Sequence, residues 1–233
     1  QRIEAGAGDD LEALLIATRA TAALLEDATD TARITRRMLE LAPEDARVLL
    51  YRAQLEAAEQ PSRAILTLSR VLQEDPTHAD AASLLATIYL ANKEPERALG
   101  FLQNAARFEP FDEGVTQNMA ALLGRKRPRA GLALTSRFIE FFDSARVPPS
   151  PVVVRTHVSL QLSINKPEPG LKLARALFKR YGRHEYILAE AEALIAIREL
   201  KRARVVLDEL HKIAPKSPML LKLEAHFKEV QGG

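Results

Sequence analysis

The side chains that most often carry chemistry in proteins are sparse in this 233-residue sequence and form no catalytic pattern. There is no Cys, which excludes a disulfide framework, a thiolate metal site and a cysteine nucleophile. No two of the five histidines stand four residues apart, and no HExxH-type spacing occurs. The histidines are His78, His157, His184, His211 and His226. His78 and His184 fall at predicted helix starts, where a capping or solvated role is expected.

Patterns for phosphate binding and for paired acid–base catalysis are equally absent. The ten glycines are scattered and form no phosphate-binding loop. Glu190 and Glu192 lie two residues apart on a predicted helix, so they point in different directions. We therefore expect no enzyme, no metal and no cofactor.

Basic side chains do cluster, and they do so in the second half of the chain. Residues 1–110 hold 12 Lys and Arg against 18 Asp and Glu, a net charge of −6, whereas residues 111–233 hold 21 against 13, a net charge of +8. The net charge of the whole chain, +2, does not indicate nucleic-acid binding. If helices stack, the basic turns line up along one edge, and this predicted basic edge consists of Arg125, Lys126, Arg127, Arg129, Lys201, Arg202 and Arg204.

The elements that must position these residues are helices. Apolar residues recur every three or four positions, as in Leu11, Leu14 and Leu15, and good helix formers dominate the composition. Alternation with period two is confined to residues 152–154. Many of the polar breaks contain Pro, which stops one helix and is tolerated where the next begins. The longest stretch without a charge, residues 81–92, is too short to span a bilayer.

Prolines at these breaks recur with a nearly fixed period. The spacing is 33 residues from Pro43 to Pro76, 34 from Pro76 to Pro110, and 105 from Pro110 to Pro215. The last value is three periods plus three residues, which we assign to the Pro-rich stretch 147–151. A period near 34 in an all-helical sequence indicates an all-α solenoid of stacked antiparallel helix pairs. About six pairs fit, followed by a C-terminal capping helix.

The repeats share a pattern of large and small residues. The clearest one reads Ala82-x2-Leu85-Ala86-x2-Tyr89, then Ala98-x3-Leu102, then Ala105 and Pro110. Alanine at these positions lets two helix backbones cross closely while long apolar residues fill the groove beside them. At this point the sequence resembles the tetratricopeptide repeat (TPR) family, over about residues 11–230. The resemblance is weaker at both ends and at 153–181, where His157 stands at the small position.

The resemblance implies a right-handed superhelical array. We expect a lead at 1–10, a single solenoid at 11–230 and a tail at 231–233. Its predicted repeats are 11–45, 46–78, 79–112, 113–149, 150–183 and 184–217, with a terminal helix at 217–230. We also expect a segment of a larger bacterial protein, because the chain begins at Gln1, ends in Gly232-Gly233, lacks Cys and is rich in Ala and Arg.

The concave face of such an array is built mainly from the first helix of each pair. Polar side chains one turn from the packing positions are expected to point into it and to suit an extended peptide or a partner's helix. The predicted concave-face residues are Arg47, Tyr51, Gln54, Asp80, Ser83, Thr87, Gln117, Asn118, Arg155, Gln161 and Glu192.

One subset of the family clamps a partner's C-terminal carboxylate with Lys, Asn and Arg from successive first helices. The matching positions here hold Ile16, Ala20, Tyr51, Asp80 and Leu84. Shifted by one repeat they hold Leu50, Gln54, Leu84, Gly114 and Asn118. Neither set supplies the cations, so we expect no carboxylate clamp of this kind.

The leading functional hypothesis is a non-enzymatic scaffold or adaptor that binds a partner protein or peptide through the concave face or an edge. The expected setting, by analogy with bacterial members of the family, is a cell-envelope or polysaccharide-export assembly. Periplasm and cytoplasm are both open, with the periplasm favoured. The alternative is an anionic polymer (a polysaccharide, an acidic protein or, less favoured for want of stacking aromatics, RNA) along the basic edge. Weak head-to-tail self-association between the −6 and +8 halves is a further possibility, and no membrane insertion is expected.

Overall fold

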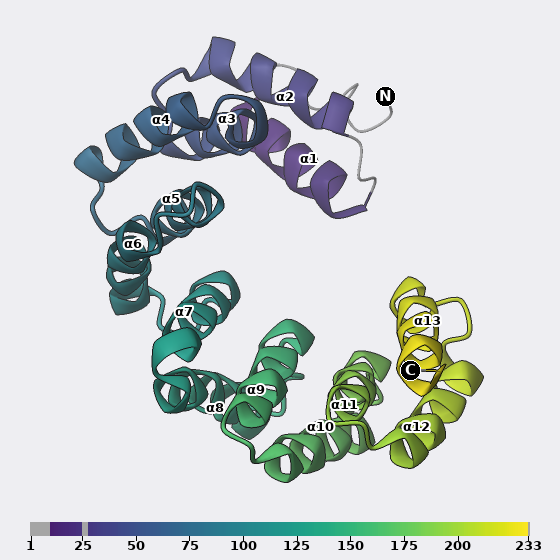
Figure 1. Cartoon of the computed structure of the whole chain (residues 1–233). Coiled ribbons are helices and arrows are strands. Elements are labelled where there is room, and N and C mark those ends of the chain that lie inside the picture. The colour runs from purple at the N-terminus through teal and green to yellow at the C-terminus, as the bar shows by residue number, and fades with distance from the viewer. Residues whose placement is uncertain (1–9, 25–27, 233) are drawn as a thin grey trace. The chain divides into compact units, whose positions relative to one another are not determined.

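The computed structural model describes residues 10–24 and 28–232, and over these residues the chain forms thirteen α-helices in stacked adjacent pairs (Figure 1). The predicted all-α array of helix pairs is therefore confirmed. Of the predicted lead at 1–10 and tail at 231–233, residues 1–9 and Gly233 lie outside the described residues. The contacts divide the chain into two compact units, at Gln1–Pro110 and Phe111–Gly233. We call them the N-terminal unit and the C-terminal unit.

The N-terminal unit contains three helix pairs. Its helices are α1 (Leu11–Leu24), α2 (Ala28–Leu41), α3 (Ala46–Glu59), α4 (Pro61–Glu74), α5 (Ala79–Ala91) and α6 (Pro95–Phe108). The two helices of each pair pack against each other. Between pairs, α2 packs on α3, α4 packs on α5, and α3 also contacts α5. Ala53 on α3 and Ala64 on α4 are fully buried, which agrees with the close crossing expected at the small positions.

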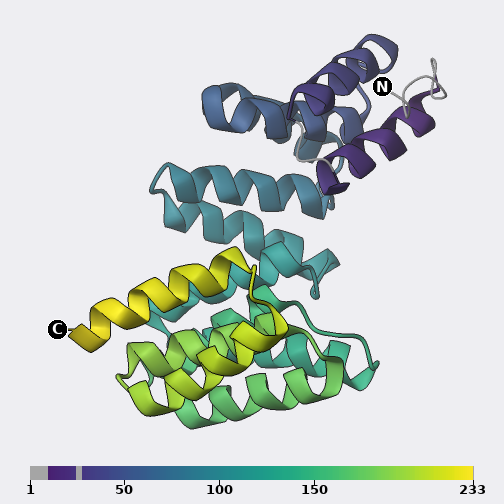
Figure 2. The ribbon, with the colours of Figure 1, turned by 90° about the vertical axis from the view of Figure 1, so that its right-hand side faces the viewer.

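The C-terminal unit contains three further pairs and a single last helix. Its helices are α7 (Glu113–Lys126), α8 (Pro128–Ser144), α9 (Pro151–Ser163), α10 (Pro167–Tyr181), α11 (His184–Ala196), α12 (Leu200–Ile213) and α13 (Pro218–Gly232). Contacts from α7 to α9, from α9 to α11 and from α11 to α13 form one layer, and α8, α10 and α12 each pack on two helices of that layer. The last helix, yellow in Figure 2, packs on α11 and α12 through buried Leu220, Leu223 and Phe227. It covers apolar surface that a terminal repeat would otherwise expose.

Local sequence explains where the helices begin. The helices that start with Pro are α4, α8, α9, α10, α13 and α6, and this position needs no backbone N–H donor. Side chains of Asp45, Asp112 and Ser150 accept backbone N–H groups at the starts of α3, α7 and α9. Gly182 ends α10 in the left-handed region, with φ of 70°, where glycine has no steric penalty.

Candidate binding grooves

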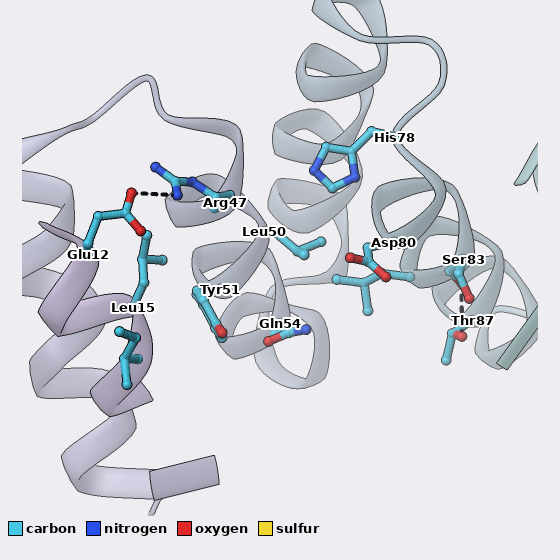
Figure 3. Close-up of a pocket in the computed structure, with 12 residues that line it drawn as sticks. Glu12, Leu15, Arg47, Leu50, Tyr51, Gln54, His78, Asp80, Ser83 and Thr87 are labelled. Carbon is cyan, nitrogen blue, oxygen red and sulfur yellow. Dashed lines mark hydrogen bonds and ion pairs between the residues drawn. The ribbon is translucent and has the colours of Figure 1, made fainter. Parts of the chain in front are cut away.

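A groove of about 600 Å³ runs along the first helices of the N-terminal unit, and we call it the N-terminal groove (Figure 3). Its lining comes from α1, α3, α5 and the residue that precedes α5. The lining residues are Glu12, Leu15, Ile16, Arg47, Leu50, Tyr51, Gln54, His78, Asp80, Ser83, Leu84 and Thr87.

Helix periodicity places these side chains together. Leu50 and Tyr51 lie three and four residues after Arg47, and Gln54 lies four and three residues after them, so the four share one face of α3. The opposite side of α3 is buried in the unit through Val48, Leu49 and Ala53. The same spacing on α5 aligns Asp80, Ser83, Leu84 and Thr87. The groove is therefore the outward face of amphipathic helices whose other face forms the core.

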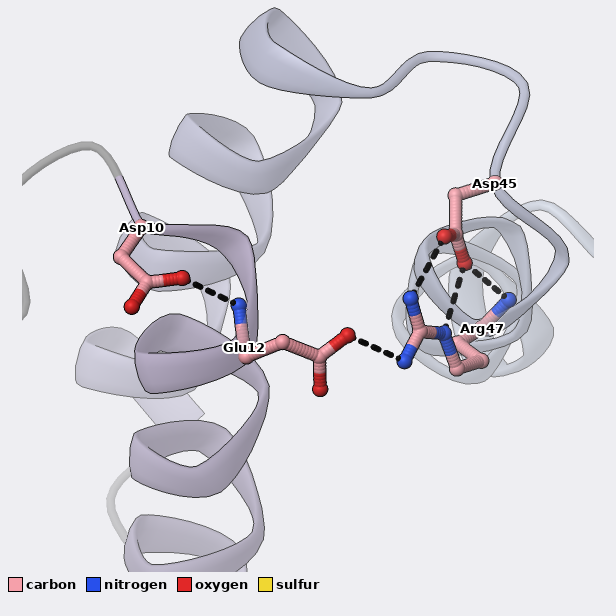
Figure 4. A network of polar contacts seen from close by, with 4 residues as sticks. All are labelled: Asp10, Glu12, Asp45 and Arg47. Atoms are coloured by element: carbon pink, nitrogen blue, oxygen red, sulfur yellow. Dashed lines mark hydrogen bonds and ion pairs between the residues drawn. The ribbon is translucent and has the colours of Figure 1, made fainter.

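A network of charges closes one end of this groove (Figure 4). Arg47 Nη1 lies 2.7 Å from Glu12 Oε1, and its Nη2 and Nε lie 2.8 and 3.1 Å from the two oxygens of Asp45. Asp45 also caps α3 by accepting the Arg47 backbone N–H at 2.9 Å. Asp10 accepts the Glu12 N–H at 3.0 Å at the start of α1. The hydrogen bonds between Arg47 and Asp45 lower the pKa of Asp45 below its ordinary value. Together with the bond to Glu12, they raise the pKa of Arg47 above its ordinary value.

The rest of the groove combines apolar and polar groups. Ile16 is 67% exposed, although it is a large apolar residue. Asp80 lies in the first turn of α5, where His78 rather than Asp80 caps the helix by accepting the Ala81 N–H at 3.4 Å. The Thr87 hydroxyl donates to the Ser83 carbonyl at 3.1 Å. Side chains of this mixture can contact both the apolar side chains and the backbone of a bound segment.

A second groove of about 650 Å³, the C-terminal groove, lies along α7, α9 and α11. Small residues make up much of its lining, namely Ala121, Gly124, Ser159, Ser163, Ala189, Ala193 and Ala196. Arg155 on α9 and Glu192 on α11 form a two-bonded ion pair within it, with Nε to Oε2 and Nη2 to Oε1 both at 2.6 Å. The pair raises the pKa of Arg155 through its hydrogen bond to Glu192.

The structure distributes the predicted concave-face residues between the two grooves. Six line the N-terminal groove: Arg47, Tyr51, Gln54, Asp80, Ser83 and Thr87. Three line the C-terminal groove: Gln117, Arg155 and Glu192. Asn118 and Gln161 line neither, and Gln161 Nε2 instead lies 3.5 Å from His157 Nε2. Whether these residues bind a partner stays a prediction.

The predicted concave-face set lacks several residues that line the N-terminal groove, among them His78, which was expected only to cap a helix or to be solvated. Leu15, Ile16, Leu50 and Leu84 are apolar, and only polar residues were selected for the concave face. Glu12 belongs to the first repeat, where the resemblance is weak. The three- and four-residue spacing that joins Leu50 to Arg47, and Leu84 to Asp80, could have identified the apolar members on α3 and α5.

The residues of the predicted basic edge differ in whether they form ion pairs with acidic side chains of the chain itself. Arg125, Arg127 and Arg129 are exposed around the α7–α8 turn and have no ion pair with any described residue. In contrast, Arg202 Nη1 lies 2.6 Å from Glu168, and Arg204 lies 4.0 Å from Asp208. Lys201 is exposed, as is Lys126. Binding of an anionic polymer along this edge stays a prediction.

Two buried polar residues of the C-terminal unit have structural contacts rather than catalytic ones. Burial lowers the pKa of His157 to about 4, so its ring is neutral near pH 7. His157 Nδ1 lies 2.9 Å from the Thr135 hydroxyl oxygen across the α8–α9 contact. Glu190 Oε2 lies 2.8 Å from Arg175 Nε, and burial raises the pKa of Glu190 although Arg175 opposes that shift. Glu190 and Glu192 therefore face different partners, as their two-residue spacing predicts.

Two further features of the described part of the chain bear on its class. No group of three or more His, Cys, Asp or Glu in residues 10–24 and 28–232 is placed to hold a metal ion. Within the same residues, every helix is too short or too polar to cross a membrane.

Stacked helix pairs that repeat about every 34 residues, with grooves along their first helices, define a helical-repeat protein. The tetratricopeptide repeat family model matches residues 55–122 of this chain, from the end of α3 into α7. No curated protein matches the sequence significantly. TPR proteins generally mediate protein–protein interactions, and the family is typically non-enzymatic.

Solved structures share the fold at low sequence identity. The structure of pilF from Pseudomonas aeruginosa is 16% identical with a TM-score of 0.64, over 94% of this chain and 99% of that one. A tetratricopeptide repeat protein from Parabacteroides merdae is 13% identical with a TM-score of 0.66, over 97% and 88%. YrrB, described as a TPR protein with an unusual peptide-binding site, is 15% identical with a TM-score of 0.52, over 82% and 97%. These likenesses concern the fold alone.

Proposed function

We propose that this chain is a non-enzymatic scaffold that holds a segment of a partner protein in its N-terminal groove. The observation that carries the proposal is the groove itself, which is about 600 Å³ in volume and is lined from three successive first helices. Its size and its mixture of side chains suit a peptide segment. YrrB, a structural neighbour, is described as having a peptide-binding site, so a peptide is an occupant that this fold can hold.

The lining supports a peptide more than a reacting small molecule. Ile16, Leu50 and Leu84 offer apolar contact for alternate side chains of an extended segment. Gln54 and Ser83 offer donors and acceptors for its backbone. Arg47 binds Glu12 and Asp45, and Asp45 also caps α3, which is an arrangement for recognition rather than for proton transfer.

The C-terminal groove supports a second contact with the same or another partner. Its alanines, serines and glycine have small side chains, so the backbone of a partner helix could approach closely. Two grooves in one chain would let the scaffold hold two segments, and their combined affinity would exceed that of either alone.

A peptide library displayed on phage, selected on the whole chain, tests the proposal. Gln54→Trp places a bulky neutral side chain in the N-terminal groove, and Gln73→Trp places the same side chain on exposed α4 surface outside it. We expect selected peptides to bind the unaltered chain and Gln73→Trp equally and to bind Gln54→Trp at least about tenfold more weakly. Selected peptides whose affinity is equal for both variants would show that the groove is not the binding surface.

We propose a bacterial cell-envelope assembly as the setting, by analogy with bacterial members of the family. Fractionation of cells that make the full-length protein tests this setting. Recovery with envelope fractions supports it, and recovery only with soluble cytoplasmic proteins contradicts it.

A further inference from the structure

We infer that the N-terminal groove selects a partner segment that carries Lys or Arg beside apolar residues. The inference rests on the proposed function and adds the charge of the partner. It is drawn from the distribution and the occupancy of the charged groups at the groove.

Carboxylates outnumber cations at the end of the groove where α1, α3 and α5 begin. Asp10, Glu12, Asp45 and Asp80 all lie in or beside these helix starts. Among the twelve described lining residues, the only Lys or Arg is Arg47. Each helix N-terminus adds about half a positive elementary charge, and this does not offset the excess of carboxylates.

Arg47 is already occupied by carboxylates of the chain itself. Its Nε and both Nη atoms make hydrogen bonds of 2.7 to 3.1 Å to Glu12 and Asp45 (Figure 4). An acidic segment would have to displace these carboxylates in order to use Arg47, and it would meet their repulsion. The groove therefore disfavours acidic partners.

Asp80 is the groove carboxylate whose side chain is accessible to a ligand. It is exposed, it lines the groove, and no hydrogen bond or ion pair joins its side chain to a described residue. Glu12, whose side chain is 66% exposed, uses one oxygen for Arg47. In Figure 3, Glu12 on α1 and Asp80 on α5 lie on either side of α3. Each wall of the groove thus offers a carboxylate to a cationic side chain of a bound segment.

The apolar lining sets the second requirement. Ile16, Leu50 and Leu84 lie in the groove beside these carboxylates, and Ile16 is largely exposed. The stems of Lys and Arg are themselves apolar and can lie on such a surface while the charged end reaches a carboxylate. A segment with a basic residue next to apolar residues therefore matches both features of the groove.

The test uses the library peptides that the unaltered chain binds and Gln54→Trp does not. These groove-binding peptides are sequenced, and their dissociation constants are measured by fluorescence anisotropy at 50 and 500 mM salt. We expect Lys and Arg to be enriched over the starting library and the affinity to fall at high salt. Asp80→Asn should weaken binding about fivefold at low salt. Glu59→Gln removes an exposed carboxylate at the far end of α3 and should leave binding unchanged.

The outcomes separate this inference from the proposed function. Groove-binding peptides without enrichment of Lys and Arg, or with the same affinity for Asp80→Asn, would overturn the inference and leave the scaffold proposal standing. A library without groove-binding peptides would overturn the proposed function and the inference with it. Circular dichroism of each variant confirms that a lost interaction is not lost folding.

Discussion

At the scale of single residues, Gly131 permits the close approach of α8 to α7. A Cβ atom at this position would lie 2.7 Å from the Ala120 carbonyl oxygen and 3.0 Å from Leu160 Cδ1. Neither distance is compatible with an unstrained contact, and the first involves backbone that cannot easily move. Gly100, on the exposed side of α6, has no such neighbour within 4 Å.

The two glycines provide a matched test of this packing. We expect Gly131→Ala to lower the free energy of unfolding by about 1–3 kcal/mol, because overpacking outweighs the gain in helix propensity. Gly100→Ala should raise it by up to about 1 kcal/mol, because only the propensity changes. Urea unfolding followed by circular dichroism measures both values. Equal effects of the two substitutions would contradict the close crossing.

His157 makes stability depend on pH in a defined direction. Its pKa is lowered from 6.5 to about 4 in the folded chain, chiefly by burial. The unfolded chain therefore binds a proton first as the pH falls, and the stabilisation present above pH 6.5 is lost between about pH 6.5 and 4. The expected loss from this residue is about 3 kcal/mol.

His157→Gln isolates this contribution, because Gln stays neutral and can still hydrogen-bond to Thr135. Unfolding free energies measured from pH 7 to 4 should fall less in His157→Gln than in the unaltered chain, by about 3 kcal/mol. Identical pH profiles would show that His157 is not the titrating group.

At the scale of helices, ion pairs recur at a separation of about one repeat. Within the N-terminal unit Arg47 pairs with Glu12, and within the C-terminal unit Arg175 pairs with Glu209 and Arg202 with Glu168. Exposed pairs of this kind contribute about 0–1 kcal/mol each. Buried apolar surface therefore provides most of the stability.

The repeat period made the helix pairing predictable, and it holds even where local propensity favours a strand. Residues 152–154 are three consecutive valines with the pattern of a short strand, yet they lie in α9. Ser150 caps this helix, Pro151 begins it, and Val153 and Val154 are fully buried. Capping and burial thus outweigh the strand preference of valine. The individual ion pairs could not be predicted, since they depend on rotamers rather than on spacing.

The role of α13 as a cap leads to a test with adjacent residues. Leu220 is 0% exposed against the end of the C-terminal unit, whereas Leu221 is 54% exposed. Leu220→Ala should lower the free energy of unfolding by about 2–5 kcal/mol, and Leu221→Ala should change it by less than about 0.5 kcal/mol. Chemical unfolding of both variants measures these free energies. A large effect of Leu221→Ala would mean that α13 packs through its other face.

At the scale of the whole molecule, the change of charge along the sequence coincides with a structural division. The net charge changes from −6 in residues 1–110 to +8 in residues 111–233, and the boundary between the two compact units falls between Pro110 and Phe111. The period predicted one series of repeats at 11–230, and it carries no information about how contacts group those repeats into compact units. Six of the eleven predicted concave-face residues line the N-terminal groove, so helix spacing together with the family resemblance indicated six of the twelve residues that line it.

The central claim is that a partner segment lies in the N-terminal groove. The most direct measurement is photo-crosslinking with a selected peptide that itself carries a benzophenone amino acid, followed by mass spectrometry of the attachment sites on the unaltered chain. Attachment to residues that line the N-terminal groove, such as Tyr51, Gln54 and Thr87, is the predicted result. Attachment only outside the groove, for example around Gln73 on the exposed surface of α4, with the peptide bound at saturation, would contradict the claim.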